Sequence, residues 1–322
     1  MAGFVAVIGM IGTPPARSED DFELREQKAL RAAVDRVAPC VVRIETIGGM
    51  ERVGRVLVGS GATTGLIVSP DGYIVSSAFG FLHNPASILV QLPDRSRKAA
   101  RRVATDHNRM LVLLKIDPER PLPVPQIAPK SHMRVGQWTI AVGRTFHPDQ
   151  PNMAVGILSA VNRIWGKAIQ TDAAVSPHNY GGPLVDIHGR VLGVLVPLAP
   201  QETTELAGIE WYDSGIGFAI PAETIQAVLP RLKQGKDLWP GLIGIHFADR
   251  SLYTAEPIIG ATRPNSPARR AGLKAGDRIV QIDNRTITLA SQVKEEISRR
   301  YAGDTVHSVS YTHLTLLTIY SV

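Results

Sequence analysis

Cysteine is nearly missing from this sequence, which narrows the classes of protein to which it can belong. Cys40 is the single cysteine among 322 residues, so a framework of internal disulfides and a cysteine-rich zinc module are both excluded. Cys40 lies between Pro39 and Val41 and is predicted to be a small buried residue, not a reactive thiol. None of the nine histidines is three or four residues from another, so we predict no metal site and no cofactor.

Aromatic residues, long apolar runs and a strong charge imbalance are also lacking. Aromatics make up 6% of the chain, and no apolar run reaches the roughly 18–20 residues of a membrane-spanning helix. The net charge is +6 and is spread over the whole chain, so nucleic-acid binding is not expected. The densest basic run, residues 95–102, has no interleaved aromatics and favours a solvated hairpin face, with an acidic partner or a lipid surface as the alternative.

The first 18 residues resemble an export signal. Ala2 to Ile11 is an apolar run, and the small residues Ala16 and Ser18 follow two prolines, as they would before a cleavage point. We therefore expect an exported protein of the periplasm or cell envelope. This N-terminal segment is also a candidate for weak association with a membrane.

Two kinds of pattern divide the rest of the chain. Residues 20–37 carry apolar residues at three-to-four spacing and predict a helix, as do residues 221–233. From Val41 to Ile220, short β-branched runs alternate with turn signals, which indicates antiparallel barrels or a sandwich. Within this stretch, residues 69–72 (Ser-Pro-Asp-Gly) predict a hairpin turn, because proline presets φ and glycine accepts a positive φ.

Nine segments resemble, in order and spacing, the HtrA family of trypsin-like proteases that carry a PDZ domain. They are GSG at 59–61, SPDGYIVSS at 69–77, LLKID at 113–117, VGQWTIAVGR at 135–144, VGILSAVNR at 155–163, IQTDAA at 169–174, NYGGPLVD at 179–186, GRVLGV at 189–194 and GIGFAIP at 215–221. The resemblance covers about residues 35–307. It implies a mainly β protein in which two packed six-stranded β-barrels of the trypsin type precede an α+β PDZ domain.

The resemblance and the composition together divide the chain into six parts. They are a signal-like segment (1–18), an N-terminal helix (19–39), a protease-fold domain (40–232), a linker (233–240), a PDZ domain (241–308) and an atypical tail (309–322). The tail is rich in threonine and unlike the strand that should close a PDZ domain. It resembles the translated read-through of a sequencing adapter, with a true β segment as the alternative.

The family's catalytic residues are replaced at the positions that match its motifs. A protease of this type needs a serine nucleophile, a histidine base and an aspartate that orients the base. By the resemblance, Phe79 stands at the histidine position, Met110 at the aspartate position and Tyr180 at the serine position. His178 stands where the family has a glycine that helps to shape the oxyanion loop.

These substitutions predict that the protease fold is kept and that peptide-bond hydrolysis is lost. Phe79 and Met110 cannot accept or hold a proton, and a tyrosine ordinarily has a pKa of about 10. Loss of a complete triad lowers the rate of a serine protease by about 10⁶. We expect Tyr180 to pack in the former pocket. Two alternatives stay open: a tyrosine nucleophile formed where His178 and Tyr180 meet, and a relocated serine site that uses Ser60, Ser76, Ser77 or Ser176.

Residues 241–307 resemble a PDZ domain in which the peptide-binding strand comes first. Such domains add a peptide as an extra strand and hold its C-terminal carboxylate on backbone N–H groups of a glycine-containing loop. Residues 265–277 carry the most specific signature of this fold. The predicted peptide-binding residues are Gly241, Leu242, Ile243 and Gly244 in the loop, Ile245 and Phe247 on the strand, and Val293 and Ile297 on the facing helix. Each of them can instead be an ordinary core residue.

The leading interpretation is an HtrA-like pseudoprotease that binds unfolded polypeptides or protein C-termini in envelope quality control. The first alternative is an active HtrA-type serine endopeptidase whose catalytic residues lie outside the family positions. The second is a structural envelope protein with an idle PDZ groove. Trimers are common in the family and depend on the segment before the first barrel, and residues 20–40 are compatible with a homotrimer.

Overall fold

The structure, a computed structural model, describes residues 19–48, 51–53, 56–58, 62–147, 149–198, 214–312 and 315–318. The signal-like segment (1–18) and Ser60 lie outside the described residues, as does part of the predicted tail. Within the described residues, no helix is both long enough and apolar enough to span a membrane.

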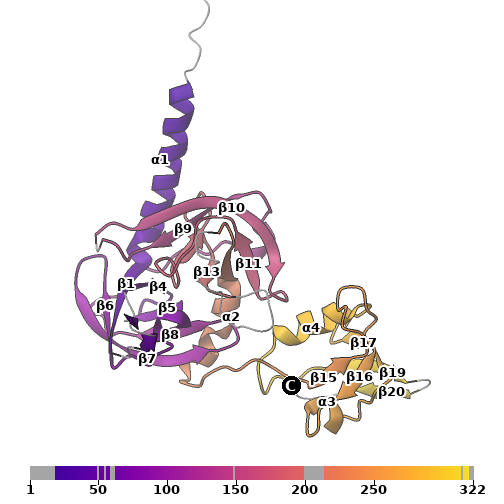
Figure 1. Cartoon of the computed structure of the whole chain (residues 1–322). Coiled ribbons are helices and arrows are strands. Elements are labelled where there is room, and N and C mark those ends of the chain that lie inside the picture. The colour runs from indigo at the N-terminus through magenta and orange to yellow at the C-terminus, as the bar shows by residue number, and fades with distance from the viewer. Residues whose placement is uncertain are drawn as a thin grey trace, which may run out of the picture.

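Six antiparallel strands close into the first barrel (Figure 1). Its interior is filled by branched aliphatic side chains, among them the fully buried Ile44, Ile67 and Leu114. A short hairpin of β2 (Glu51–Val53) and β3 (Val56–Val58) follows its first strand in sequence. Around the barrel the strands are β1 (Val41–Ile47), β4 (Thr63–Ile67), β5 (Tyr73–Ser77), β8 (Leu111–Lys115), β7 (Arg97–Asp106) and β6 (Ser87–Gln91).

A second closed barrel of six antiparallel strands packs against the first, which confirms the expected pair of barrels. One hydrophobic cluster contains residues of both barrels, such as Val41 and Leu66 of the first and Ile140 and Val194 of the second. Around the second barrel the strands are β10 (Asn152–Arg163), β11 (Ala168–Thr171), β14 (Gly217–Pro221), β13 (Val191–Val196), β12 (Pro183–Val185) and β9 (Trp138–Gly143). Short 3₁₀ helices lie at Ala38–Cys40 (η1), Ala78–Phe81 (η2) and Lys130–His132 (η3).

The turn expected at residues 69–72 is present and fixes the β4–β5 hairpin. The N–H of Gly72 donates to the carbonyl oxygen of Ser69 at 3.1 Å, and Gly72 has a φ of +94°. The carbonyl oxygen of Gly72 in turn accepts the N–H of Ile116 at 3.0 Å. A Cβ at residue 72 would collide with the carbonyl oxygen of Ile116, so the close approach of the two chains requires glycine.

Helix α1 (Glu19–Val37) corresponds to the helix expected over residues 20–37 and projects from the barrels (Figure 1). Ala33, Val34 and Val37 in its C-terminal part are buried, whereas Phe22 near its beginning is 72% exposed. Cys40 follows in η1 and is buried, as predicted. Burial raises the pKa of its thiol to about 11, so this cysteine is unreactive at neutral pH.

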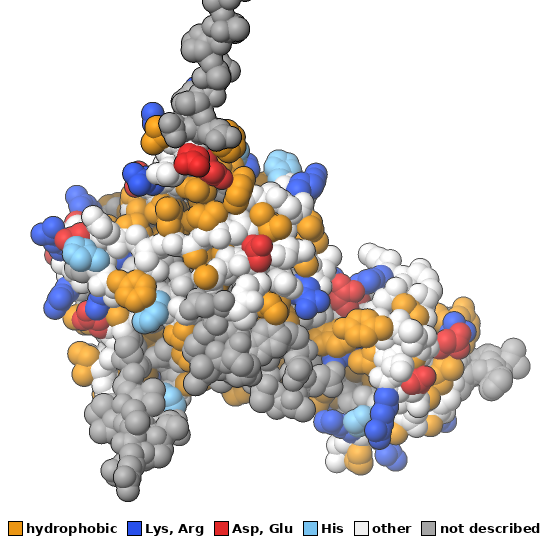
Figure 2. All heavy atoms as spheres, turned by 45° about the horizontal axis from the view of Figure 1, so that its top comes forward, with side chains coloured by type: hydrophobic (Ala, Val, Ile, Leu, Met, Phe, Trp, Pro, Cys, Tyr) orange, Lys and Arg blue, Asp and Glu red, His pale blue; other side chains and the backbone are white. Residues whose placement is uncertain are grey.

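The basic run at residues 95–102 lies on the β6–β7 hairpin, where its charges find local partners. Arg95 pairs with Asp149 at 2.7 Å, and Lys98 pairs with Glu119 at 2.5 Å. On the face shown in Figure 2, lysine and arginine side chains are scattered and mixed with acidic ones. These contacts agree with a solvated hairpin face.

Helix α2 (Ala222–Lys233) leads from the second barrel to a C-terminal α+β domain. The strand that carries Ile245 and Phe247 begins directly after Gly244, whose φ of +77° interrupts the extended chain. Ser308–Thr312 pairs with Arg278–Ile282, so the first residues of the predicted tail belong to a sheet. The elements of the domain are β15 (Ile245–Phe247), β16 (Ile259–Thr262), α3 (Pro267–Arg270), β17 (Arg278–Ile282), β18 (Arg285–Thr286), α4 (Ala290–Ser298), β19 (Ser308–Thr312) and β20 (Thr315–Thr318).

The C-terminal domain is joined to the first barrel by a polar seam centred on the carboxylate of Asp106, which has no exposed surface. The hydroxyl of Tyr301 donates to Oδ2 of Asp106. The other carboxylate oxygen of Asp106, Oδ1, accepts the N–H groups of Asn108 and Arg109, both at 3.0 Å. One carboxylate therefore shapes the β7–β8 loop and receives a side chain that follows α4.

The same loop binds the end of α4. Nδ2 of Asn108 donates to the carbonyl oxygen of Ser298 at 2.9 Å, and Nη2 of Arg109 donates to that of Arg299 at 2.9 Å. The last carbonyl groups of a helix have no partners within the helix, so these side chains supply the missing donors. Docking of the C-terminal domain thus gives the end of α4 donors that the helix itself lacks.

The variant Tyr301→Phe tests this seam. It leaves Oδ2 of buried Asp106 without its hydroxyl donor, so we expect the free energy of unfolding to fall by about 1–3 kcal/mol at neutral pH. Burial raises the pKa of Asp106, and the hydrogen bond from Tyr301 partly opposes this. A raised folded-state pKa means that stability from this group is present at low pH and is lost as the pH rises through that pKa.

Tyr301→Phe raises this pKa further, so the loss measured by urea denaturation should be larger at about pH 7 than at about pH 4. Tyr311→Phe is the control, because Tyr311 is 52% exposed and should tolerate loss of its hydroxyl. Equal losses at the two pH values would show that the hydroxyl does not act through the Asp106 carboxylate.

Candidate functional site

Phe79 and Tyr180, aligned by the resemblance with the catalytic histidine and serine, are in contact. Phe79 lies in η2 directly after β5, and the Oγ of Ser77 accepts its N–H at 3.3 Å. The two ring centroids are 5.6 Å apart with an interplanar angle of 72°, an edge-to-face arrangement. Tyr180 is 4% exposed and belongs to the core of the second barrel, against which Phe79 also packs. The site therefore contains an aromatic pair that is continuous with the core.

The loop that carries Tyr180 is tied to the first barrel by its backbone. The carbonyl oxygen of Tyr180 accepts the hydroxyl of Thr63 at 3.1 Å. The next residue, Gly181, has a φ of +83°, and its N–H donates to the carbonyl oxygen of Leu195 at 2.8 Å. A Cβ at residue 181 would collide with the Oγ of Ser76, so the two barrels approach closely here. The loop is thus held in place without help from a catalytic side chain.

His178 lies apart from the aromatic pair. Its side chain is exposed and packs against the ring of Phe146, with centroids 4.5 Å apart. Its carbonyl oxygen accepts the hydroxyl of Thr64 at 3.1 Å. Phe146 is 67% exposed and was not anticipated from the sequence, where an aromatic residue in a proline-containing segment gives no specific signal. The imidazole of His178 is therefore at the surface, whereas the phenol of Tyr180 is buried.

Met110, aligned with the catalytic aspartate, ends the loop that contains Asp106. It has a φ of +56°, which is uncommon for a residue with a side chain. Its carbonyl oxygen accepts the N–H of Ala78 at 2.8 Å, which brings it next to the residue that precedes Phe79. Its side chain is 7% exposed and lies in the cluster shared by the two barrels. All three aligned positions are thus occupied by packed, uncharged side chains.

Two candidate serines near this site have structural partners. Ser76 is fully buried and its hydroxyl donates to the carbonyl oxygen of Thr64 at 2.6 Å. Ser77 accepts the N–H of Phe79, as described above. Ser176 is partly exposed, and its carbonyl oxygen accepts the N–H of Asn179 at 2.9 Å. Among the residues that the structure describes, no group of three His, Cys, Asp or Glu side chains could hold a metal ion.

The predicted peptide-binding residues of the C-terminal domain come together around β15. Ile243, Ile245 and Phe247 are partly buried against a core that includes Val293 and Ile297 of α4. β15 pairs with β16 on one side, in a sheet of two strands. This places a strand edge and an apolar wall beside each other.

The loop before β15 has one exposed apolar side chain and a fixed shape. Leu242 is 59% exposed. The N–H of Gly241 donates to the carbonyl oxygen of Arg300 at 2.9 Å, and the carbonyl oxygen of Ile243 accepts the N–H of Ala268 at 3.0 Å. The carbonyl oxygen of Gly244 accepts the N–H of Arg263 at 2.8 Å. The loop is thus anchored at both ends.

Comparison with known proteins identifies both parts of the chain. A sequence model of the trypsin-like peptidase domain matches residues 63–194, and one of the PDZ domain matches residues 241–313. The probable periplasmic serine endoprotease DegP-like of Halomonas elongata is 32% identical over 257 residues, which cover 76% of this chain and 52% of that protein. In sequence and in domain order, the chain is similar to the HtrA/DegP proteases. It spans about half the length of the curated relatives it matches.

Solved structures of HtrA proteases share this architecture. The HtrA-type protease AlgW with a bound tripeptide has a TM-score of 0.71 and 25% identity, over 91% of this chain and 95% of that one. The serine endoprotease from Yersinia pestis has a TM-score of 0.65 and 26% identity, over 91% and 96% of the two chains. The expected fold class is confirmed: two six-stranded antiparallel barrels of the trypsin fold are followed by an α+β PDZ domain.

The contact between Phe79 and Tyr180 can be measured by a double-mutant cycle. We expect Phe79→Ala and Tyr180→Ala to be coupled by about 0.5–1.5 kcal/mol in the free energy of unfolding, because each ring loses the other as a packing partner. Urea denaturation of the two single variants and the double variant gives the coupling. Phe81→Ala with Tyr180→Ala is the matched control, since Phe81 packs in the separate core of the first barrel and the two changes should be additive. Additivity in both cycles would contradict the contact.

Proposed function

We propose that this chain is an HtrA-like pseudoprotease, which binds unfolded polypeptides or protein C-termini but does not cleave them. The observation that supports this most strongly is the edge-to-face contact of partly buried Phe79 with buried Tyr180. The family resemblance assigns these two positions to the catalytic histidine and serine. A hydrolytic site needs an accessible nucleophile with a base in hydrogen-bonding reach, and two packed rings supply neither.

The position aligned with the catalytic aspartate points in the same direction. Met110 has a thioether, which cannot orient or stabilise a protonated base. The buried carboxylate of its loop, Asp106, is engaged by Tyr301 and by two backbone N–H groups of the loop. It therefore serves the domain seam and not a reacting group.

Peptide binding is proposed for the PDZ domain. The edge of β15 could accept an extended peptide as an added strand, with Val293 and Ile297 beside its side chains. Because the N–H of Gly241 is bound to Arg300, the later loop residues Leu242 and Ile243 would hold the terminal carboxylate. Two AlgW structures were solved with a decapeptide and with a tripeptide, which supports peptides as the ligand class.

We also propose that the chain is exported to the periplasm or cell envelope and that it forms a homotrimer. The curated relatives are named periplasmic, and the apolar N-terminal segment agrees with export to the periplasm or cell envelope. Phe22 and Leu24 are exposed on the projecting helix α1, which suits contact with further copies in a homotrimer.

Digestion of reduced casein by the purified chain tests the loss of catalysis. We expect no cleavage above that of Tyr180→Ala, with an active HtrA protease run as the positive control. Cleavage that disappears in Tyr180→Ala would sink the proposal and make Tyr180 part of an unusual active site. Cleavage that survives in Tyr180→Ala and is blocked by a serine-directed covalent probe would instead reveal an endopeptidase with a relocated serine.

Peptide binding is tested on the full chain by fluorescence polarisation. A labelled ten-residue peptide with an apolar C-terminal residue is compared as the free acid and as the amide. We expect the acid to bind at least about tenfold more tightly than the amide, because only a carboxylate gains charge-assisted hydrogen bonds in the loop. Leu242→Asp should weaken binding of the acid by about tenfold through like-charge repulsion.

The matched control is Val135→Asp, which adds the same charge at a site 62% exposed on the barrel and should leave binding unchanged. Equal affinities for the acid and the amide would contradict carboxylate capture by this loop.

A further inference from the structure

A cavity of about 550 Å³ lies between the barrels and the PDZ domain, apart from the aromatic pair and from the edge of β15. Its barrel side is formed by the β7–β8 loop, the residues around Lys130 and Lys167, and one side of α2. Its PDZ side is formed by the end of α4 and by the residues that follow it. The cavity is lined by six cations, Arg109, Lys130, Lys167, Arg231, Arg299 and Arg300, and by three acidic residues, Glu223, Glu296 and Asp304.

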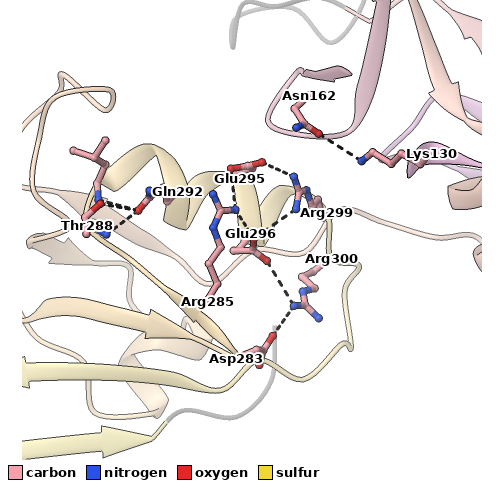
Figure 3. A network of polar contacts seen from close by, with 11 residues as sticks. Lys130, Asn162, Asp283, Arg285, Thr288, Gln292, Glu295, Glu296, Arg299 and Arg300 are labelled. Carbon is pink, nitrogen blue, oxygen red and sulfur yellow. Dashed lines mark hydrogen bonds and ion pairs between the residues drawn. The ribbon is translucent and has the colours of Figure 1, made fainter. Parts of the chain in front are cut away.

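The acidic residues on the PDZ side are already engaged. Figure 3 shows Glu295 and Glu296 of α4 shared among Arg285, Arg299 and Arg300. Nη1 of Arg285 lies 2.7 Å from Oε1 of Glu296, and Nη1 of Arg299 lies 3.6 Å from the same oxygen. Asp283 also lies 2.5 Å from Nη2 of Arg300, so three carboxylates hold the three guanidinium groups of this wall in place.

On the barrel side, Lys130 faces this wall across the cavity (Figure 3). Its Nζ is 3.5 Å from the amide oxygen of Asn162, a neutral partner. Glu223 binds the backbone N–H of Lys130 at 3.0 Å. Burial, and to a lesser extent the positive charge of Arg299, lower the pKa of Lys130, while Glu223 and Glu295 oppose this shift.

Arg109 contributes buried donors that have no acceptor within the described residues. Its side chain is 5% exposed and its Nη2 binds the carbonyl oxygen of Arg299. Its Nε and Nη1 make no hydrogen bond, and the nearest carboxylate oxygen, of Asp106, is 3.7 Å from Nη1. The Nε of Arg299 is a further buried donor of this kind. Buried donors are nearly always paired in folded proteins, so these nitrogens indicate an acceptor that enters from the cavity.

We propose that this cavity binds a small multivalent phosphate anion and that the anion bridges the barrels and the PDZ domain. Four of the six cations are arginines, whose planar groups match phosphate oxygens in pairs. Six cationic side chains from both domains line the cavity, so an anion with several oxygens, which can contact more than one of them, suits it better than a single carboxylate. An extended nucleic acid is disfavoured, because the cationic side chains converge in one bounded cavity and do not form a continuous surface track.

Phosphate groups reach proteins from two kinds of source: free inorganic phosphates and phosphomonoesters. Inorganic pyrophosphate, inorganic phosphate and glycerol 3-phosphate are therefore each titrated into the full chain by calorimetry at constant ionic strength. We expect saturable binding of at least one of them. Tighter binding of pyrophosphate would identify a free polyphosphate as the source, and tighter binding of glycerol 3-phosphate would identify a phosphomonoester.

The variant Lys130→Gln removes one cation from the barrel side, and Lys130→Gln with Lys167→Gln removes two. We expect the double variant to weaken binding by about tenfold or more. The matched control, Arg97→Gln with Lys98→Gln, removes two cations at the opposite end of β7 and should bind as the original chain does. Saturable binding should also slow tryptic cleavage at Lys236 in the segment between the domains, because the bound anion contacts both of them.

The proposal is overturned if no phosphate compound binds at millimolar concentration, or if the pocket and control variants lose affinity equally, which would indicate non-specific charge attraction. Circular dichroism of each variant shows whether a loss of affinity comes from misfolding. Lys130→Gln is the decisive variant if the double variant is unstable, because the contact of its Nζ with Asn162 is long. The outcome does not depend on whether the chain cleaves or binds peptides.

Discussion

The buried carboxylate of Asp106 is the constraint on which the relation between the two domains depends. Removal of a carboxylate from water is costly unless donors replace the lost solvent. Two of its donors are N–H groups of its own loop, and the third is the hydroxyl of Tyr301, which the PDZ domain supplies. The carboxylate therefore has all three of these donors only when the PDZ domain is docked. Docking is part of the fold and not an optional contact.

This constraint extends to the former catalytic region. The loop that begins at Asp106 ends at Met110, whose carbonyl oxygen holds the N–H of Ala78 one residue before Phe79. The backbone of the Tyr180 loop, which contacts Phe79 through Tyr180, is held by the hydroxyl of Thr63 and by the carbonyl oxygen of Leu195. The scaffold that would position a triad is thus maintained by main-chain contacts. Because these contacts do not require catalytic side chains, aromatic and thioether groups can occupy those positions and add to the core.

The sequence was informative where structure follows from local pattern. Short β-branched runs separated by turn signals predicted antiparallel barrels or a sandwich. The resemblance to HtrA proteases then favoured two barrels and aligned Phe79 and Tyr180 with the catalytic histidine and serine. The positive φ of Gly244, at the end of the loop before β15, is a property of the folded chain. The bond between Tyr301 and Asp106 joins residues 195 positions apart, and neither belongs to a recognisable motif. No local pattern could reveal it.

The sequence pattern also did not reveal where cationic side chains gather in the folded protein. The run at residues 95–102 is the densest group of cations in the sequence, yet Asp149 and Glu119 neutralise part of it at the surface. The cations of the interdomain cavity come instead from positions 109, 130, 167, 231 and 299–300, and none of these stands in a long basic run. They converge because the seam at Asp106 draws α4 onto the barrel. This cluster of cationic side chains is therefore created by folding, at the junction where the two domains meet.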